Sequence, residues 1–210
     1  MITNRFAAMN FVELSDDMLK ADASLVDFLL HAALESDLRF FELIGKNVRD
    51  HKMVASRLVI EHQSDLYGGL LAVNPTNGSF AGLMVSMPLK EVLQSQRHSL
   101  RAYHKAAVNP VQFRMAIKTF ASRKMAIPDE DVLYLSRLYI SKEYRGTGLS
   151  EQMLVHLINV GQRSGLKTCG LHVDASNLRA ISLYLRTGFV LEAPSPPGKS
   201  DYFYMKMPCY

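Results

Sequence analysis

Arg145-Gly146-Thr147-Gly148-Leu149-Ser150 is a glycine-containing loop between a predicted strand and a predicted helix. The strand, residues 132–140, is rich in apolar, aromatic and β-branched side chains. The predicted helix has small or apolar residues recurring at helical spacing, at Met153, Leu154, Leu157, Ile158 and Gly161. A strand that enters a helix through two glycines leaves the first-turn N–H groups free, at the positive end of the helix dipole. The stretch therefore predicts an anion site that suits a pyrophosphate.

Three known phosphate-binding loops share this general design, and the residues distinguish them. A P-loop requires a lysine directly after its second glycine, and no lysine follows Gly148. A dinucleotide fingerprint requires a third glycine where Glu151 stands, and this carboxylate would repel a nearby pyrophosphate. The loop resembles the Gln/Arg-x-x-Gly-x-Gly/Ala signature of the GNAT superfamily of acyl-CoA-dependent N-acetyltransferases, with Arg145, Gly148 and Ser150 at the defined positions. Ser150 replaces the last small residue of that signature.

A second motif downstream adds to the resemblance. Asn177-x-x-Ala180-x-x-x-Tyr184, followed by Gly188-Phe189, is similar to the other GNAT signature. Asn177 lies where the start of a helix needs a side-chain cap, and Gly188 lies where the end of a helix takes the left-handed conformation. The two motifs occur in the expected order and together cover about residues 132–190.

The remaining patterns predict an α/β (α+β mixed) GNAT fold, with a splayed mixed central sheet of about six to seven strands flanked by helices. Expected strands are 9–13, 66–73, 80–87, 132–140, 171–173, 190–192 and 202–207, and expected early helices are 16–34 and 37–56. Asn74-Pro75-Thr76-Asn77-Gly78 predicts the turn of a β-hairpin. We expect residues 1–210 to form a single domain.

The composition and the cysteine pattern bear on the cellular compartment and on metal binding. The apolar and charged fractions, 48% and 21%, are ordinary for a soluble globular protein. We expect a cytoplasmic protein without membrane contact, because the first residues lack a signal-type apolar core and no run reaches membrane-spanning length. Cys169 and Cys209 show no metal spacing and no disulfide framework, and the histidines show no ligand spacing, so we predict no metal site.

A helical insert is expected at about residues 88–128, between the third and fourth strands, with a break at Asn109-Pro110. Its basic residues are Lys90, Arg97, Arg101, Lys105, Arg114, Lys118, Arg123 and Lys124, against the single acid Glu91. The insert therefore has a net charge of +7. The remainder of the chain has a net charge of −3, and together they give the overall +4. A basic lid over the acceptor site, a docking face for an anionic partner, a solvated face and a subunit contact all remain open. Nucleic acid is an unlikely partner, because no recognition motif accompanies these charges.

The resemblance implies acetyl-CoA as cosubstrate. The main chain of the fourth strand would pair with the pantetheine arm, and the N–H groups of the loop would hold the pyrophosphate. The implied cofactor-binding residues are Leu138, Tyr139, Ile140, Arg145, Gly146, Thr147, Gly148, Leu149, Ser150 and Asn177. A main-chain N–H near Leu138 is a candidate donor to the thioester oxygen, and Arg186 is placed to reach a phosphate.

Tyr184 is the implied general acid, because a phenol of pKa ~10 suits a leaving thiolate of pKa ~8.5 or slightly above. The alternative is an aromatic ring packed on the helix with its hydroxyl in water. No general base is evident, since residues 132–140 contain no carboxylate. His172, His98 and His104 are candidates, and a water chain or an acceptor amine of low pKa would need no dedicated base.

Two function classes follow. The first is an N-acetyltransferase that transfers an acetyl group directly to a primary amine of a small molecule or a protein. The second is a non-catalytic or regulatory module of GNAT fold that binds acyl-CoA. Neither the acceptor amine nor the oligomeric state is readable from the residues, although a homodimer would suit a fold with exposed strand edges.

Overall fold

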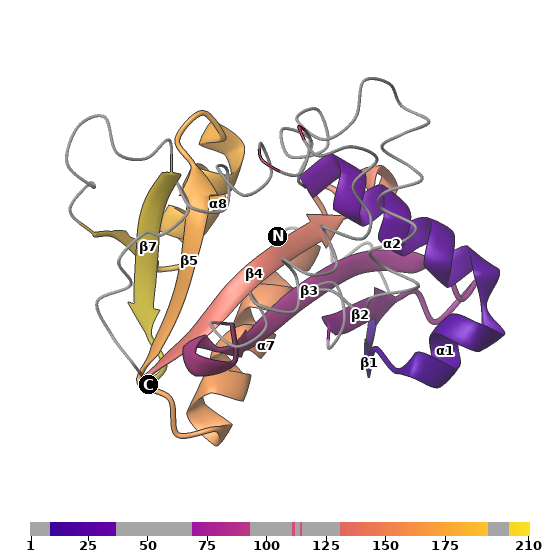
Figure 1. Cartoon of the computed structure of the whole chain (residues 1–210), viewed down its shortest axis with the longest axis horizontal. Helices are drawn as coiled ribbons and strands as arrows, with labels where there is room; N and C mark the ends of the chain where they lie inside the picture. Colours follow the sequence, from indigo (N-terminus) through magenta and orange to yellow (C-terminus); the bar gives the residue numbers. More distant parts are fainter. Residues whose placement is uncertain (1–8, 37–68, 93–110, 112–113, 115–130, 193–201) are drawn as a thin grey trace, which may run out of the picture.

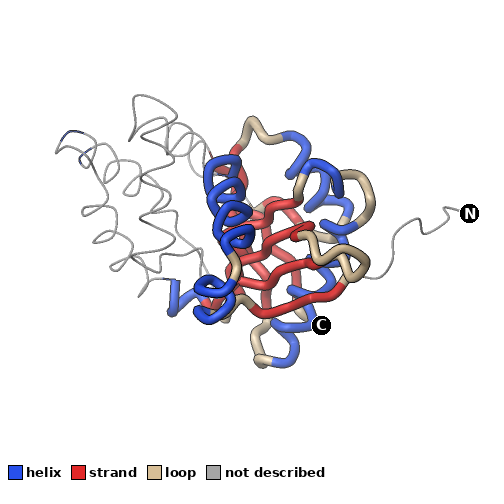
Figure 2. The backbone as a smooth tube through the Cα atoms, turned by 90° about the vertical axis from the view of Figure 1, so that its right-hand side faces the viewer, coloured by secondary structure: helices blue, strands red, loops and turns tan. Residues whose placement is uncertain are grey.

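A mixed sheet with helices on both faces makes up the part of the chain described by the computed structural model, residues 9–36, 69–92, 111, 114, 131–192 and 202–210 (Figures 1 and 2). The strands are β1 (Asn10–Glu13), β2 (Gly69–Val73), β3 (Phe80–Pro88), β4 (Val132–Ile140), β5 (Thr168–Asp174), β6 (Val190–Leu191) and β7 (Tyr202–Pro208). The helices are α1 (Asp16–Ala21), α2 (Ala23–Ser36), α7 (Leu149–Arg163) and α8 (Leu178–Arg186), with a 3-10 turn, η2 (Lys142–Tyr144). The strand order β1-β2-β3-β4-β5-β7-β6 confirms the predicted fold class.

The sheet splays at its centre, between β4 and β5. These two strands pair in parallel, but only from Val132 opposite Thr168 to Leu135 opposite Leu171. Beyond that pair the strands separate, and Figure 1 shows them diverging from a shared end. On its other side, β4 stays paired antiparallel with β3 as far as Ile140. Among the described strands, the second half of β4 therefore has a neighbour on one side only.

A β-bulge accompanies the splay. Val85 is paired with Arg137 and Ser86 with Leu135, so that Ser136 is the extra residue on β4. The Ser136 hydroxyl donates to the Val85 carbonyl oxygen at 3.1 Å, which anchors the extra residue. A bulge bends its strand and increases the local twist, and here it lies where β4 leaves β5.

Two hydrophobic clusters cover the two faces of the sheet. Leu83 and Val85 of β3 pack with α1 and α2, whereas Met84 between them packs with α7. Side chains from α8 and β5 join the α7 cluster, and Leu171 of β5 and Phe189, which follows α8, are almost fully buried. The splayed strands are thus held between α2 on one face and α7 with α8 on the other.

Some expectations need correction. The predicted helix 16–34 is two helices, because Asp22 is extended, with φ of −132°, and its side chain accepts from the Ser24 N–H at 2.8 Å. This contact caps the start of α2, and Asp22 and Ser24 were the available signal. The predicted helix 37–56 lies outside the described residues, as does most of the insert 88–128. The predicted hairpin, the strand 132–140 and the two closing strands are confirmed.

Candidate functional site

The main chain of β4 faces the gap left by β5. The Ser141 N–H donates to the Ala81 carbonyl oxygen at 2.9 Å, which makes these two residues a hydrogen-bonded pair of the β3–β4 ladder. Such pairs alternate along an antiparallel ladder, so Tyr139 is used by β3, whereas Leu138 and Ile140 direct their N–H and C=O groups toward β5. Since β5 pairs no further than Leu171, the groups of Leu138 have no strand partner among the described residues.

Arg145 is turned toward β4 and α2. Its Nε donates to the Ile140 carbonyl oxygen at 2.9 Å, and its Nη2 lies 2.6 Å from Oε1 of Glu35. The guanidinium also lies 6.0 Å from the centre of the Tyr139 ring. The side chain therefore braces the start of the loop and occupies one of the acceptors that face the gap.

The glycines give the loop the shape expected of an anion cradle. Gly146 has φ of +76° and Gly148 has φ of +85°, a left-handed region that disfavours other residues. Gly148 is the N-cap of α7, and its C=O accepts the first helical bond, from Gln152 at 3.1 Å. The N–H groups of residues 149–151 precede this first bond, so they have no acceptor within the helix.

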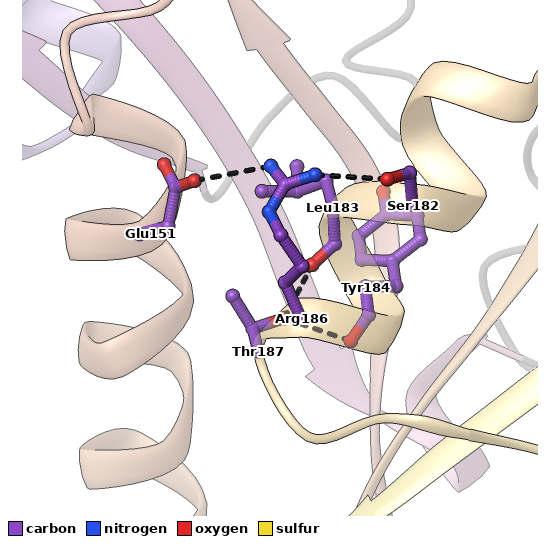
Figure 3. A network of polar contacts seen from close by, with 6 residues as sticks. All are labelled: Glu151, Ser182, Leu183, Tyr184, Arg186 and Thr187. Carbon is purple, nitrogen blue, oxygen red and sulfur yellow. Dashed lines mark hydrogen bonds and ion pairs between the residues drawn. The ribbon is translucent and has the colours of Figure 1, made fainter.

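Arg186 adds positive charge beside the start of α7. Figure 3 shows it between Glu151 of α7, at 3.5 Å, and the Ser182 hydroxyl of α8, at 2.9 Å. The ion pair offsets the carboxylate that argued against a dinucleotide fingerprint at this loop. It also links the two helices that carry the two sequence motifs.

The second motif is built as a capped helix. The Asn177 side chain accepts from the Ala180 N–H at 3.1 Å, which confirms the predicted N-cap. Gly188 has φ of +97°, which confirms the predicted left-handed helix end. Tyr184 lies on the buried face of α8, with an exposed fraction of 9%, and its ring packs edge-on against Phe189 at 5.6 Å. Burial raises the pKa of Tyr184 above its ordinary value, and the nearby Tyr134 adds to the rise.

Tyr134 and His172 meet where β4 and β5 separate. The Tyr134 hydroxyl lies 3.0 Å from Nδ1 of His172, and the Tyr204 ring packs against the same imidazole at 4.9 Å, tilted by 43°. Burial lowers the pKa of His172 to about 4, so this ring is neutral at physiological pH. Its Nε2 is buried and has no hydrogen-bond partner among the described residues. This pair was not foreseen, because only the β4–β5 pairing brings the two residues together.

The remaining groups considered from the sequence are two cysteines and two histidines. Cys169 and Cys209 are buried with their sulfur atoms 2.8 Å apart, a contact that their sequence spacing did not indicate. His98 and His104 lie outside the described residues. Within the described parts of the chain, no three side chains of His, Cys, Asp or Glu gather as metal ligands would. None of the described helices combines the length and the apolar character that crossing a membrane requires.

The gap beside β4 thus lies before a helix that begins at a left-handed glycine. Residues 91–189 match the model of the acetyltransferase (GNAT) family. Just under half of the chain is therefore similar to this family of acetyltransferases.

Two curated relatives show a similarity of the same kind. The N-alpha-acetyltransferase MAK3 of Arabidopsis thaliana is 33% identical over 57 residues, 27% of this chain and 30% of the relative. The [ribosomal protein bS18]-alanine N-acetyltransferase of Escherichia coli K12 is 33% identical over 86 residues, 38% of this chain and 57% of the relative. The matches thus span less than two thirds of either relative.

Solved structures share the fold. A crystal structure titled acetyltransferase has a TM-score of 0.62 at 17% identity, with 96% of this chain and all of that chain covered. The Escherichia coli ribosomal-protein-S18-alanine N-acetyltransferase has a TM-score of 0.52 at 18% identity, with 96% and 94% covered. At these identities the likeness concerns the fold alone.

Proposed function

We propose that this chain is an acetyl-CoA-dependent N-acetyltransferase that transfers the acetyl group directly to a primary amine. The observation that carries the proposal is the placement of unpaired main-chain groups along one path. The path runs from Leu138 in the gap between β4 and β5 to the N–H groups of the loop 146–150 at the start of α7.

The donor would bind mainly to the main chain. The pantetheine arm would take the place that β5 leaves, bonding the N–H and C=O of Leu138 and the N–H of Ile140. The Ile140 carbonyl oxygen already accepts from Arg145, so it is left out of this arrangement. The diphosphate would accept from the N–H groups of residues 146–150, with Arg186 close by.

Tyr184 would act as general acid. The attacking amine forms a bond to the thioester carbon, and collapse of the tetrahedral intermediate releases the thiolate of CoA. Because burial raises its pKa, the Tyr184 hydroxyl stays protonated at neutral pH and is able to give its proton to this thiolate.

The Tyr134–His172 pair would receive the proton of the amine. The hydrogen bond of 3.0 Å orients the two groups, and they lie at the end of the gap where the thioester would be. A neutral imidazole with a pKa of about 4 is a weak base. Such a base suits an acceptor amine that is already partly neutral.

This weak base favours an α-amino group over a lysine as acceptor. At pH 7.4, deprotonating a lysine of pKa ~10.4 costs about 4 kcal/mol, whereas an α-amine of pKa ~7.8 costs less than about 1 kcal/mol. The two curated relatives are named for N-alpha and alanine acetylation. We therefore propose the N-terminal amine of a peptide or protein as the acceptor class.

A thiol-release assay tests the proposal. The protein is incubated with acetyl-CoA and one of two matched peptides, one with a free N-terminus and no lysine, the other with a blocked N-terminus and one lysine. We expect release of CoA and acetylation with the first peptide at a rate at least ten times that with the second. Equal rates would refute the α-amine preference. Binding of acetyl-CoA without turnover on any amine would support the non-catalytic module, which the lack of a carboxylate on β4 favours.

A further inference from the structure

We infer that Glu35 is a positioning residue for the donor site, which holds the start of the phosphate-binding loop through Arg145. The inference rests on the proposed function, because it concerns the affinity for the diphosphate of the donor. It adds α2, an element outside both sequence motifs, to the residues that determine this affinity.

The contacts of Arg145 show how the loop is held. One guanidinium nitrogen bonds the Ile140 carbonyl oxygen at 2.9 Å while another bonds Glu35 at 2.6 Å. Only the planar fork of an arginine makes two such bonds in fixed directions, which a lysine ammonium does not reproduce. Arg145 directly precedes Gly146 and Gly148, whose left-handed conformations shape the cradle. Fixing its side chain fixes the direction in which the loop begins.

The carboxylate comes from a helix that is itself held firmly. Glu35 is the second-to-last residue of α2, whose Leu25 and Leu29 are fully buried. Phe28 of the same helix packs edge-on against Tyr139 of β4 at 5.6 Å. Burial, and then the charge of Glu35, raise the pKa of Tyr139, so this carboxylate lies beside the phenol as well as the guanidinium.

A second brace holds the loop from the opposite side. The Tyr144 hydroxyl lies 2.9 Å from the Asn74 amide nitrogen and 2.7 Å from the Ser79 hydroxyl, both in the turn between β2 and β3. The Thr147 hydroxyl donates to the Tyr144 carbonyl oxygen at 2.7 Å. With these contacts intact, removing Glu35 should loosen the loop start without unfolding the loop.

The pairing also keeps charge away from the cradle. Because Glu35 and the Ile140 carbonyl oxygen direct the guanidinium toward α2 and β4, the diphosphate is left to the main-chain donors. An exposed ion pair alone contributes little, but here two bonds and a ring contact fix one arginine. A loss of about fivefold in donor affinity, equal to about 1 kcal/mol, is the size we expect.

The test compares two donors in Glu35→Gln, Arg145→Lys and the double variant. Acetyl-CoA carries the diphosphate, and S-acetylpantetheine lacks it. Each single variant should weaken the Kd for acetyl-CoA about fivefold, and the double variant should lose no more than about tenfold, because both changes break the same contact. In Glu35→Gln, the kcat/KM with S-acetylpantetheine should stay within about twofold of the parent protein. Asp17→Asn, which removes the exposed Asp17–Lys20 pair of α1, is the control and should change neither value.

Three results would overturn the inference: unchanged or tighter acetyl-CoA binding in Glu35→Gln, equal losses with both donors in that variant, or losses that multiply in the double variant. If the parent protein itself binds no acetyl-CoA, the proposed function fails too. If the parent binds and the variants match it, the role of Glu35 alone is refuted.

Discussion

At the scale of single residues, the proposed chemistry of the site depends on burial more than on charge. Tyr184 and His172 are both shifted toward their neutral forms by the surrounding protein. A neutral phenol is able to give a proton and a neutral imidazole is able to receive one, which are the two proton transfers that acetyl transfer needs.

Replacing Tyr184 by phenylalanine tests the acid. The change removes one hydroxyl and keeps the ring that packs on Phe189, so the fold should persist. We expect kcat to fall about tenfold or more while the Kd for acetyl-CoA stays within about twofold. Steady-state kinetics and calorimetry measure the two quantities. Tyr210→Phe, at an exposed position, is the control, and equal kcat in the Tyr184→Phe and Tyr210→Phe proteins would remove Tyr184 from the mechanism.

Because His172 is buried in its neutral form, the free energy of unfolding should fall as the pH is lowered. Its pKa falls from about 6.5 in the unfolded chain to about 4 in the folded one, so the unfolded chain binds more protons below pH 6.5. The stability that neutral His172 contributes is fully present above pH 6.5 and is lost as the pH falls toward 4. Roughly 2 kcal/mol of it is lost between pH 7 and pH 5. Urea unfolding at pH 7 and pH 5 should therefore show a loss of stability that is smaller in His172→Gln than in the parent protein by roughly 2 kcal/mol. The same loss in both proteins would contradict the buried, neutral assignment.

The residues found from the sequence are those fixed by local spacing. Asn177, Gly188 and Gly148 carry their signals in turn and cap chemistry, which depends on a few neighbouring residues. The Tyr134–His172 contact joins residues 38 positions apart, and the Glu35–Arg145 contact joins residues 110 positions apart. Such contacts depend on tertiary packing, so no local pattern indicated them.

At the scale of elements, the proposed site is a junction of β4, the loop and α7. The bulge at Ser136 turns β4 away from β5, and Gly148 starts α7 without a capping side chain. Strand 132–140 was predicted with its observed bounds because its composition is unambiguous. The break between α1 and α2 was missed because apolar spacing continues across Asp22.

A pair of glycine substitutions separates backbone strain from ligand binding. Gly148 and Gly165 both have positive φ, +85° and +68°, and a Cβ at either would meet no atom within 4 Å. An alanine at either position should therefore lower the stability by a similar amount, roughly 1–2 kcal/mol. Gly148→Ala should also weaken acetyl-CoA binding about tenfold, because its Cβ enters the proposed diphosphate position. Equal acetyl-CoA Kd values in the two variants would place the diphosphate elsewhere.

At the scale of the whole molecule, charge is unevenly distributed along the chain. The segment 88–128 carries +7 and the remainder −3, although most of this segment lies outside the described residues. The order of elements along the chain was predicted because apolar periodicity and turn residues are local signals. The direction and depth of the splay were not predicted, since they depend on the bulge and on where the β4–β5 ladder ends.

Salt dependence tests whether the basic segment faces the acceptor. If it does, raising the ionic strength from about 20 to 200 mM should raise the KM of an acidic acceptor peptide about fivefold. Neutralising Arg97, Arg101 and Lys105 to glutamine should abolish that dependence. Neutralising Lys20, Arg163 and Lys167 removes the same charge elsewhere and should preserve it. Unaltered salt dependence in the first variant would make the segment structural.

The most direct measurement for the main-chain donor site is a titration of the 15N-labelled protein with acetyl-CoA, followed by amide NMR. Saturable shifts should concentrate on the amides of residues 146–150 and of Leu138, while the amides of β6 and of α1 stay in place. A folded protein whose loop and β4 amides do not move at millimolar acetyl-CoA would contradict the account.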